Sequence, residues 1–291
     1  MLWSVLTLGA AAAAVAVGMM HAQAREYGVI TEEATVRLLP RAFDGTRIFF
    51  ITDLHRRAIP DGLIAQCLEA GGADLVIIGG DLAEKGVPLA RTRANIHKLR
   101  RIAPIYAIYG NHDTVCDQRA LEVMLREEGV HVLVNSNVLL EQGGERVLLC
   151  GIDDSIHDRD RLDLALDGTL AGIAESEEGR RSVCKILLAH DPLIAAQLSG
   201  MEADLILSGH THGGQMRLPL YGPLLRTRSV RLYRSGWFEI GARQKAAGEA
   251  AARLLVSNGF GTSKVPLRLF VPPQTHLLTL RCPTPDRSGQ S

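Results

Sequence analysis

Five short polar motifs, each following an apolar run, constrain the fold of this chain more than any other feature. Apolar runs of this length are typical of buried β-strands. The motifs are Asp53-Leu54-His55, Gly80-Asp81-Leu82-Ala83-Glu84, Gly110-Asn111-His112-Asp113, Ala189-His190-Asp191 and Gly209-His210-Thr211-His212. Because open α/β sheets bind ligands beyond the carboxyl ends of their strands, we expect the five motifs to meet in one cleft.

The remaining pattern predicts an α/β fold with a largely parallel sheet. In the first half, strands are predicted at residues 47–52, 75–79 and 105–109, and helices at 62–70, 89–101 and 119–128. The second half is predicted to hold a hairpin at 138–150, a helix at 170–177, and strands at 185–189, 205–208, 231–240, 253–257 and 276–281. Strands that alternate with helices in this way are typical of a layered α/β domain.

Residues 1–24 are predicted to form a membrane anchor or a signal segment. They contain no Asp, Glu, Lys or Arg, and a membrane span needs ~20 apolar residues. Ala22-Gln23-Ala24 resembles a cleavage site, so a cleaved secretory signal is one alternative and a buried or disordered arm is another. The first basic residue, Arg25, follows the span, which favours a membrane-associated protein with its catalytic domain in the cytoplasm; a cleaved signal would export it.

The rest of the chain divides into three parts. Residues 25–46 are predicted to be a linker and leading strand, with an apolar part at 36–39. Residues 47–282 are predicted to form the main domain, and residues 283–291 a disordered tail.

The five cysteines are widely spaced and form no CxxC pair, so we expect free thiols and a reducing compartment. Cys67, Cys150 and Cys184 are predicted to be core residues.

Composition argues against nucleic acid as a partner. Lys+Arg and Asp+Glu number 32 each, and aromatic residues make up 4% of the chain. The chain therefore has neither an overall basic field nor many side chains on which bases could stack. Nothing in the sequence indicates the oligomeric state.

The motifs supply two carboxylates, one amide oxygen and four imidazoles as candidate metal ligands. This set suits two adjacent divalent ions, and phosphoryl chemistry is the most natural use of such a pair. Mixed nitrogen and oxygen ligands without thiolate favour Mn, Fe, Zn or Co. The seven candidates are Asp53, His55, Asp81, Asn111, His190, His210 and His212.

The motifs resemble those of the calcineurin-like metallophosphoesterases. The resemblance spans residues 43–280 and is closest to the small bacterial membrane-associated phosphodiesterases at the strings 51–55, 207–215 and 259–263. It implies an αββα sandwich in which two mixed β-sheets are flanked by helices, with a dinuclear metal site at the carboxyl ends of the strands.

The resemblance also implies a role for each motif residue. Asp53, His55 and His212 would bind one metal; Asn111, His190 and His210 would bind the other; and Asp81 would bridge both. His112 would face the scissile phosphate as a catalytic residue. The family's usual Asp that orients this histidine is replaced by Glu84, which we expect to take the same role. Arg56 is a weaker candidate for binding a substrate phosphate.

The sequence thus predicts a metal-dependent phosphoesterase that cleaves a phosphodiester or pyrophosphate through a hydroxide activated by two metals. The resemblance suggests a lipid-linked or nucleotide-sugar substrate, and the N-terminal segment suggests the membrane as a partner. A phosphomonoesterase acting on small phosphate esters is the closest alternative. A non-catalytic, metal-bound scaffold tethered to the membrane is an alternative from a different class.

Overall fold

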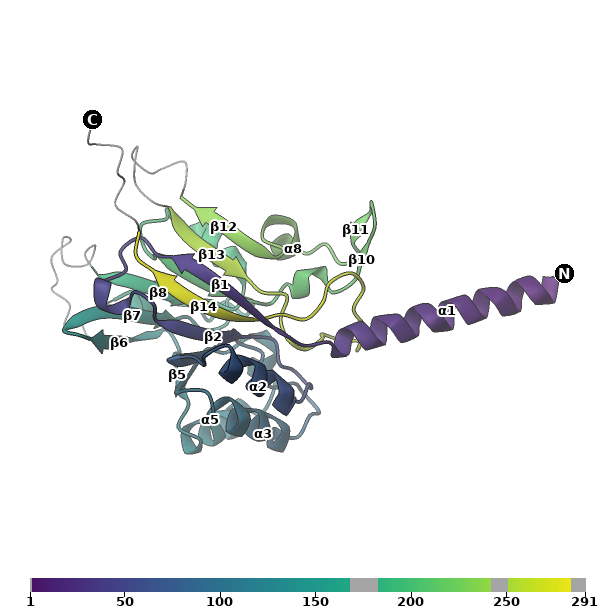
Figure 1. Ribbon diagram of the computed structural model, residues 1–291, viewed down its shortest axis with the longest axis horizontal. Helices are drawn as coiled ribbons and strands as arrows, with labels where there is room; N and C mark the ends of the chain where they lie inside the picture. The colour runs from purple at the N-terminus through teal and green to yellow at the C-terminus, as the bar shows by residue number, and fades with distance from the viewer. Residues whose placement is uncertain (1, 168–182, 242–250, 284–291) are drawn as a thin grey trace.

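Two β-sheets lie face to face in the computed structural model, and helices cover their outer faces (Figure 1). The structure describes residues 2–167, 183–241 and 251–283, and within these ranges each of the two sheets has six strands. The αββα sandwich with two mixed sheets is therefore confirmed. The predicted helix at 170–177 and the predicted disordered tail, apart from Pro283, lie outside the described residues.

The first sheet contains the strands of the first half of the chain together with the last strand. Its strands β2 to β5 run parallel, β14 is antiparallel to β2, and β1 is parallel to β14. Its order is β1 (Val29–Thr35), β14 (Thr275–Arg281), β2 (Arg47–Ile51), β3 (Leu75–Ile78), β4 (Ile105–Ala107) and β5 (His131–Val132).

The second sheet contains the strands of the second half. Its inner strands β7, β8, β9 and β13 run parallel, and an antiparallel strand closes each edge. The predicted hairpin is the pair β6–β7, with Gly143 and Gly144 at φ 58° and 80° in its two-residue turn. The order is β12 (Gly236–Ile240), β13 (Ala252–Val256), β9 (Leu205–Ser208), β8 (Cys184–Leu188), β7 (Glu145–Gly151) and β6 (Ser136–Gln142).

Alternation along β2 shows how the layers are built. Ile48 and Phe50 pack between the two sheets, whereas Phe49 and Ile51 pack against the helices on the outer face. Both faces of the strand are buried, which explains why its sequence is a continuous apolar run. Helices α2 (Asp61–Glu69), α3 (Leu89–Leu99) and α5 (Gln118–Glu127) cover this outer face.

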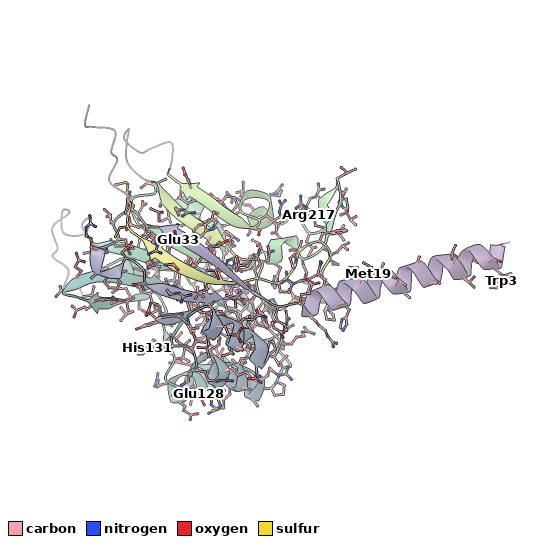
Figure 2. All side chains as sticks on the ribbon, in the orientation of Figure 1. Trp3, Met19, Glu33, Glu128, His131 and Arg217 are labelled. Atoms are coloured by element: carbon pink, nitrogen blue, oxygen red, sulfur yellow. The ribbon has the colours of Figure 1, made fainter. Side chains whose placement is uncertain are left out.

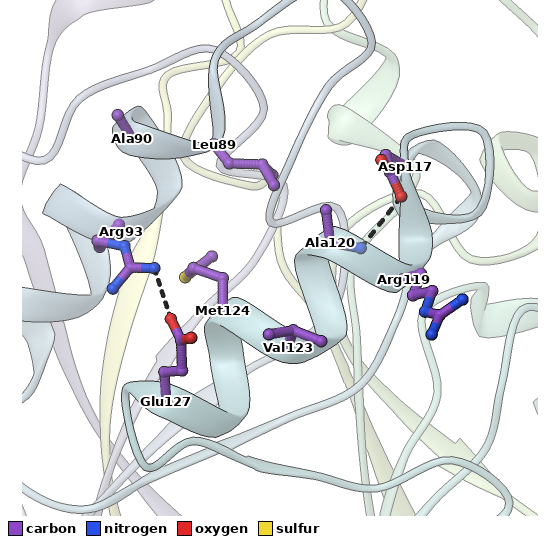
Figure 3. Close-up of a pocket in the computed structure, with 9 residues that line it drawn as sticks. All are labelled: Leu89, Ala90, Arg93, Asp117, Arg119, Ala120, Val123, Met124 and Glu127. Atoms are coloured by element: carbon purple, nitrogen blue, oxygen red, sulfur yellow. Dashed lines mark hydrogen bonds and ion pairs between the residues drawn. The ribbon is translucent and has the colours of Figure 1, made fainter.

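Helices α3 and α5 pack side by side over a shallow surface depression (Figure 3). Asp117 caps α5 by accepting a hydrogen bond from the backbone N–H of Ala120 at 3.1 Å. Arg93 of α3 forms an ion pair with Glu127 of α5 at 2.8 Å. The apolar face of α5 packs into the core through Leu121, Met124 and Leu125, and Met124 also lines the depression.

The other outer layer is thinner. It consists of η3 (Pro192–Gln197), α6 (Leu162–Ala165) and α8 (Arg228–Leu232) beside the second sheet, and a third apolar core fills the space beneath η3 and α6. The short elements η1 (Arg41–Phe43), α4 (Asn111–Thr114), η4 (His212–Gly214), β10 (Arg217–Leu218) and β11 (Gly222–Pro223) complete the described fold.

Two predicted strands begin in the wrong place. The strand predicted at 231–240 starts at Gly236, because Thr227 caps helix α8 by accepting from the backbone N–H of Val230, and Gly236 at φ 89° turns the chain after it. The leading strand is Val29–Thr35, before the apolar stretch at 36–39. Its edge position leaves Glu32 and Glu33 outside the core, which removes the apolar signal of a strand.

The predicted core cysteines Cys67, Cys150 and Cys184 are buried, and all five cysteines are free thiols. Burial raises the pKa of the Cys67 thiol to about 11 and that of Cys150 to about 12. These thiols are therefore protonated at neutral pH and do not act as nucleophiles.

The N-terminal segment is a single helix, α1 (Leu2–Arg25), which projects away from the sandwich (Figure 1). Its stretch Leu6–Arg25 is long and apolar enough to cross a membrane, with a mean hydropathy of 1.3, and most of it is exposed, although Ala24 at its base is buried against the rest of the protein. This agrees with the predicted anchor in length and composition, which a signal sequence would share.

Candidate metal centre

The five motifs meet at one edge of the sandwich, as expected from their places after strands. Asp53 and Asp81 follow β2 and β3 of the first sheet, and His190 and His210 follow β8 and β9 of the second. Contacts between the sheets join them: the backbone N–H of His210 donates to the Asp53 carboxylate at 3.2 Å, and His190 Nε2 lies 3.3 Å from Asp81 Oδ2. One cluster of buried side chains thus forms from both sheets.

The first group of possible metal ligands is Asp53, His55 and His212. The Nε2 atoms of the two imidazoles are 3.1 Å apart, and Asp53 Oδ1 lies 3.3 Å from His212 Nε2. Burial lowers the pKa of His55 and brings that of His212 well below its ordinary value, so both rings are neutral at pH 7. Neutral rings whose ring nitrogens converge beside a carboxylate fit a bound cation.

A second group is Asp53, Asp81 and His190. The Nδ1–H of His190 donates to the backbone carbonyl of Gly79 at 2.8 Å, which assigns the tautomer and leaves Nε2 pointing at Asp81. A ligating histidine is usually oriented by such a bond on its other nitrogen. His190 Nε2 is buried and makes no hydrogen bond in the described structure, so it is an unpartnered ring nitrogen that a metal could occupy in place of a proton.

The charges in this group also fit a cation. Burial opposes ionisation of His190, but the Asp81 carboxylate outweighs it and raises the pKa of His190 to about 10. Burial alone would raise the pKa of Asp81, but the surrounding histidines outweigh burial, so the pKa of Asp81 is lowered. Asp81 therefore remains ionised in a buried place, where an anion needs a positive partner.

Asn111 and His210 complete the set of seven predicted ligands. His210 Nδ1 lies 3.0 Å from Asn111 Oδ1. Burial lowers the pKa of His210, so its ring is neutral as well. All seven predicted side chains therefore lie together, and the donor set fits two divalent cations.

His112 lies at the open side of the cluster. Its backbone N–H, and not its ring, contacts Asp81, donating to Oδ1 at 2.8 Å. The ring packs edge-on against His55 with 4.7 Å between ring centroids, and it lines a cavity at the metal-ligand cluster. His112 is thus the motif histidine that lines this cavity without being a predicted metal ligand.

The backbone of the site is strained. Five of the seven predicted ligands have left-handed φ values, which residues with a Cβ rarely adopt. Each costs about 1–2 kcal/mol relative to an ordinary conformation, and such residues cluster at functional sites. They are Asp53 at 56°, His55 at 49°, Asp81 at 53°, His210 at 68° and His212 at 48°.

Asp113 holds two of the motif loops together. It is fully buried and accepts hydrogen bonds from the backbone N–H groups of Gly110, Ala83 and Leu82 at 2.9, 2.8 and 3.2 Å. Burial and the nearby Asp81 charge raise its pKa to about 7 despite these bonds. Asp113 is therefore placed to position the loops that present Asp81 and Asn111.

Gly110 is close-packed against Asp81, and this predicts a steric effect. A Cβ added at Gly110 would lie 2.3 Å from Asp81 Oδ1. We expect Gly110→Ala to displace this carboxylate and to lower kcat/KM by about 10²-fold, the scale of an ångström-sized misplacement. Steady-state kinetics would measure this, with Gly28→Ala as the control because no atom lies within 4 Å of its added Cβ. Equal activity of the two variants would contradict the prediction.

Glu84 and Arg56 contact each other. The Arg56 guanidinium donates to both carboxylate oxygens of Glu84, and the pair lies beside His55, whose Nδ1 is 3.9 Å from Glu84 Oε2. Within the described residues no hydrogen bond or ion pair joins Glu84 to His112. Orientation of His112 by Glu84 and phosphate binding by Arg56 stay predictions.

Arg268 is a functional residue of the site that the motifs did not reveal. Its side chain is fully buried and donates to the carbonyls of Asn258, Gly259, Gly261 and Val271 at 2.6–3.2 Å. The loop it holds packs behind Asp53, since a Cβ on Gly259 would lie 2.7 Å from Asp53 Cβ. The signal in the sequence is a lone charge inside the apolar stretch 265–271.

Loss of Arg268 should therefore destabilise the protein. Arg268→Met would leave several buried carbonyls without a donor, each costing about 1–3 kcal/mol, so we expect the free energy of unfolding to fall by at least about 3 kcal/mol. Urea unfolding of the full chain in detergent would measure the loss. Arg231→Met, which changes an exposed arginine, is the matched control; an equal effect of both changes would rule out the role of Arg268.

A cavity of about 380 Å³ opens beside the metal-ligand cluster. Its polar side includes Asn111, His112, His210 and His212. The apolar side chains that also line it, which we call the apolar wall, are Met216, Leu224, Leu225, Val230 and Val265. The cavity is therefore lined both by predicted metal ligands and by this apolar wall.

The fold and this site define a metal-dependent phosphoesterase, and the sequence comparisons agree. Residues 46–214 match the calcineurin-like phosphoesterase family. The uncharacterized protein YpbG of Bacillus subtilis (strain 168) is 38% identical over 235 residues, which cover 80% of this chain and 80% of YpbG. The phosphodiesterase YaeI of Escherichia coli (strain K12) is 27% identical over 243 residues, covering 80% and 82%.

The Bos taurus protein named transmembrane protein with metallophosphoesterase domain is 29% identical over 218 residues, which cover 69% of this chain and 47% of that relative. With its family match and its similarity to YpbG, this chain belongs to the calcineurin-like phosphoesterase family.

Proposed function

We propose that this phosphoesterase hydrolyses a phosphodiester or pyrophosphate bond in a lipid-linked substrate at the membrane surface. The observation that supports the lipid-linked substrate is the cavity, because the apolar side chains Met216, Leu224 and Leu225 line it together with predicted metal ligands. An amphiphilic phosphoester matches both parts of this lining, with its phosphate at the histidines and its apolar part along the wall.

In this proposal Asp53, His55 and His212 hold one divalent ion, Asn111, His190 and His210 hold the other, and Asp81 is shared. The bound ions would supply a nucleophile at neutral pH and neutralise charge on the phosphate oxygens. Mn, Fe, Zn and Co all suit these ligands, because the set mixes imidazole nitrogen with oxygen and has no thiolate.

The protein's own groups do the positioning and the proton transfer. The Gly79 carbonyl and Asp113 fix the ring of His190 and the loops beside Asp81, so the ligand atoms are held before substrate arrives. His112 faces the cavity and is placed to donate a proton to the leaving oxygen. Glu84 would orient His112, and Arg56, whose guanidinium contacts Glu84, would bind a substrate phosphate.

Helix α1 and the free thiols support a proposal for membrane attachment and for the compartment of the catalytic unit. We propose that 1–24 anchor the protein and that 47–282, with the strand in 25–46, form the catalytic unit on the cytoplasmic side, with 283–291 as a tail. Arg25 at the end of the apolar helix and five free thiols support that side. A relative of similar sequence is named as a transmembrane protein, which supports the anchor.

Substrate class can be tested on the full chain purified in detergent. We expect bis-p-nitrophenyl phosphate to be cleaved faster than p-nitrophenyl phosphate when Mn²⁺ is present, and chelation to abolish cleavage. Preference for the monoester would instead establish a phosphomonoesterase. Bound metal without turnover of either compound, or of the alkyl esters below, would indicate the non-catalytic scaffold.

The lipid-linked part has its own test. A p-nitrophenyl phosphodiester of a long-chain alcohol should have a higher kcat/KM than the matching methyl ester. Leu224→Asn, at a half-exposed position of the apolar wall, should reduce this preference for the long chain. Equal kcat/KM for both esters in the unmodified protein would refute a lipid-linked substrate and favour a polar one such as a nucleotide-sugar.

A further inference from the structure

Five large apolar side chains lie exposed at the end of the sandwich from which α1 projects. We call them the apolar rim: Leu218, Leu220, Tyr221, Val265 and Phe270. Tyr221 is 60% exposed, Phe270 is 61% exposed and Leu220 is fully exposed. Single apolar residues on a surface are ordinary, but a gathered set marks an interaction site.

The apolar rim is one surface although its residues come from two segments. The β10–β11 hairpin supplies the first three, and the loop at 263–271 supplies Val265 and Phe270. The segments are joined because the backbone N–H of Arg217 donates to the carbonyl of Leu269 at 2.9 Å. Leu218, Leu220 and Phe270 line the same surface hollow of about 160 Å³.

The same loop holds the base of α1. The backbone N–H of Arg268 donates to the Met20 carbonyl at 3.1 Å, and His21 Nδ1–H donates to the Pro266 carbonyl at 3.1 Å. Arg57 donates to the carbonyl of Arg25 at 2.6 Å. In Figure 2, Arg217 and Met19 lie toward this end of the body, whereas Glu128 and His131 lie away from it.

Helix length then places the rim relative to a bilayer. About 20 residues at 1.5 Å each cross the ~30 Å apolar layer, so a helix that enters at Leu2 leaves it near His21, and one that enters at Leu6 leaves it near Arg25. Met20 is the residue bonded to Arg268 in the loop that carries Val265 and Phe270. If α1 spans the membrane, the apolar rim is therefore at its surface.

Charge around the rim matches an anionic lipid surface. Residues 205–238 and 250–285 contain no Asp or Glu. Arg217, Arg226 and Lys264 are exposed within these segments, beside the apolar side chains. Basic residues around an apolar patch are typical of surfaces that bind anionic membranes.

We propose that the apolar rim inserts into the headgroup region of an anionic bilayer and forms a second membrane contact beside α1. The helix alone would leave the body free to rotate and tilt, whereas two contacts fix its orientation. Val265 belongs to both the rim and the cavity lining, and Leu224 of the cavity lining directly follows β11, so this orientation turns the cavity toward the lipid surface. The proposal goes beyond the proposed function, because it holds whichever phosphoester is cleaved.

Tryptophan quenching in bilayers tests the contact without any turnover. The full chain, with Trp3→Phe to remove the tryptophan in α1, is reconstituted in anionic vesicles whose acyl chains are brominated. Leu220→Trp places a probe on the rim. Val123→Trp is the control, because Val123 is 49% exposed on α5, which lies on the other side of the body from β10 and β11 (Figure 1). Trp237 contributes equally to both proteins.

We expect brominated lipid to quench the added emission of Leu220→Trp and to leave that of Val123→Trp unchanged. Zwitterionic vesicles should quench Leu220→Trp less, because the arginines and the lysine then lack anionic partners. Equal emission of Leu220→Trp in brominated and ordinary lipid would overturn the proposal. So would shielding of this tryptophan from both acrylamide and brominated lipid, which would mean that a second copy of the chain covers the rim.

Discussion

Asp81→Ala is expected to abolish metal binding and phosphodiester hydrolysis together. The Asp81 carboxylate is fully buried, with Oδ2 3.3 Å from His190 Nε2 and 3.5 Å from His55 Nε2. These rings belong to the two proposed ion sites, so one carboxylate serves both. Removing a residue that only orients a metal ligand lowers metal affinity or activity by about 10–100-fold. Removing a ligand that both ions share should therefore lower metal affinity and activity by more than about 10²-fold.

Metal content by mass spectrometry and turnover of bis-p-nitrophenyl phosphate would be measured on the same preparation. Asp81→Asn, which keeps the shape and removes the charge, should show the same joint loss and guards against misfolding as the cause. Asp163→Ala changes an exposed aspartate away from the site and is the matched control. Full activity of Asp81→Asn would contradict the shared role.

Most elements could be predicted because their signals are local. The run at 47–52 is apolar on both faces because β2 lies between two cores, one formed with the other sheet and one with the helices. The ligand motifs could be recognised for a related reason, since each follows directly after such a strand. Residue type and position after a strand were sufficient to bring all seven predicted ligands to one cluster.

Features that depend on distant partners could not be predicted in this way. Strand β1 is held by its pairing with β14, and its exposed edge allows the charged Glu32 and Glu33. Helix α8 depends on a cap by Thr227, which overrides the β-branched and aromatic residues that follow. Local patterns do not contain this information, because it resides in contacts made after folding.

The same limit applies to side-chain direction at the site. The motif at 80–84 identifies Glu84 as a carboxylate near the metal ligands, but its partner in the structure is Arg56, which directly follows the first motif. Arg268 is far from every motif in the sequence and yet supports the loop behind Asp53. Ligand positions follow from the topology, whereas the contacts that orient the ligands follow from packing.

The apolar rim adds a consequence for catalysis. A membrane-fixed body would bring the cavity to substrate that diffuses in two dimensions, and catalysis would then depend on groups at the cavity mouth. His112 lines the cavity together with His210 and His212, and it is the one of the three that is not a predicted metal ligand. Its role therefore determines whether the site performs proton transfer to a leaving group or only binds metal.

His112→Ala is expected to keep its metal while turnover falls by about 10²–10⁴-fold, the scale for loss of a general acid. The reason is geometric: the backbone N–H of His112 contacts Asp81, and the ring lines the cavity. A competing role exists, because a ring nitrogen of His112 lies within 4.8 Å of ligand atoms of His55 and Asp81. Metal content distinguishes the two roles, since a ligand's loss would remove the ion.

The leaving group provides a second readout. A p-nitrophenolate leaves without needing a proton, whereas an alkoxide needs one, so His112→Ala should slow cleavage of a dialkyl phosphodiester more than that of bis-p-nitrophenyl phosphate. A histidine that only stabilises phosphate charge would slow both alike. Equal losses for the two esters, with metal retained, would therefore reject proton donation by His112 and assign it to electrostatic stabilisation.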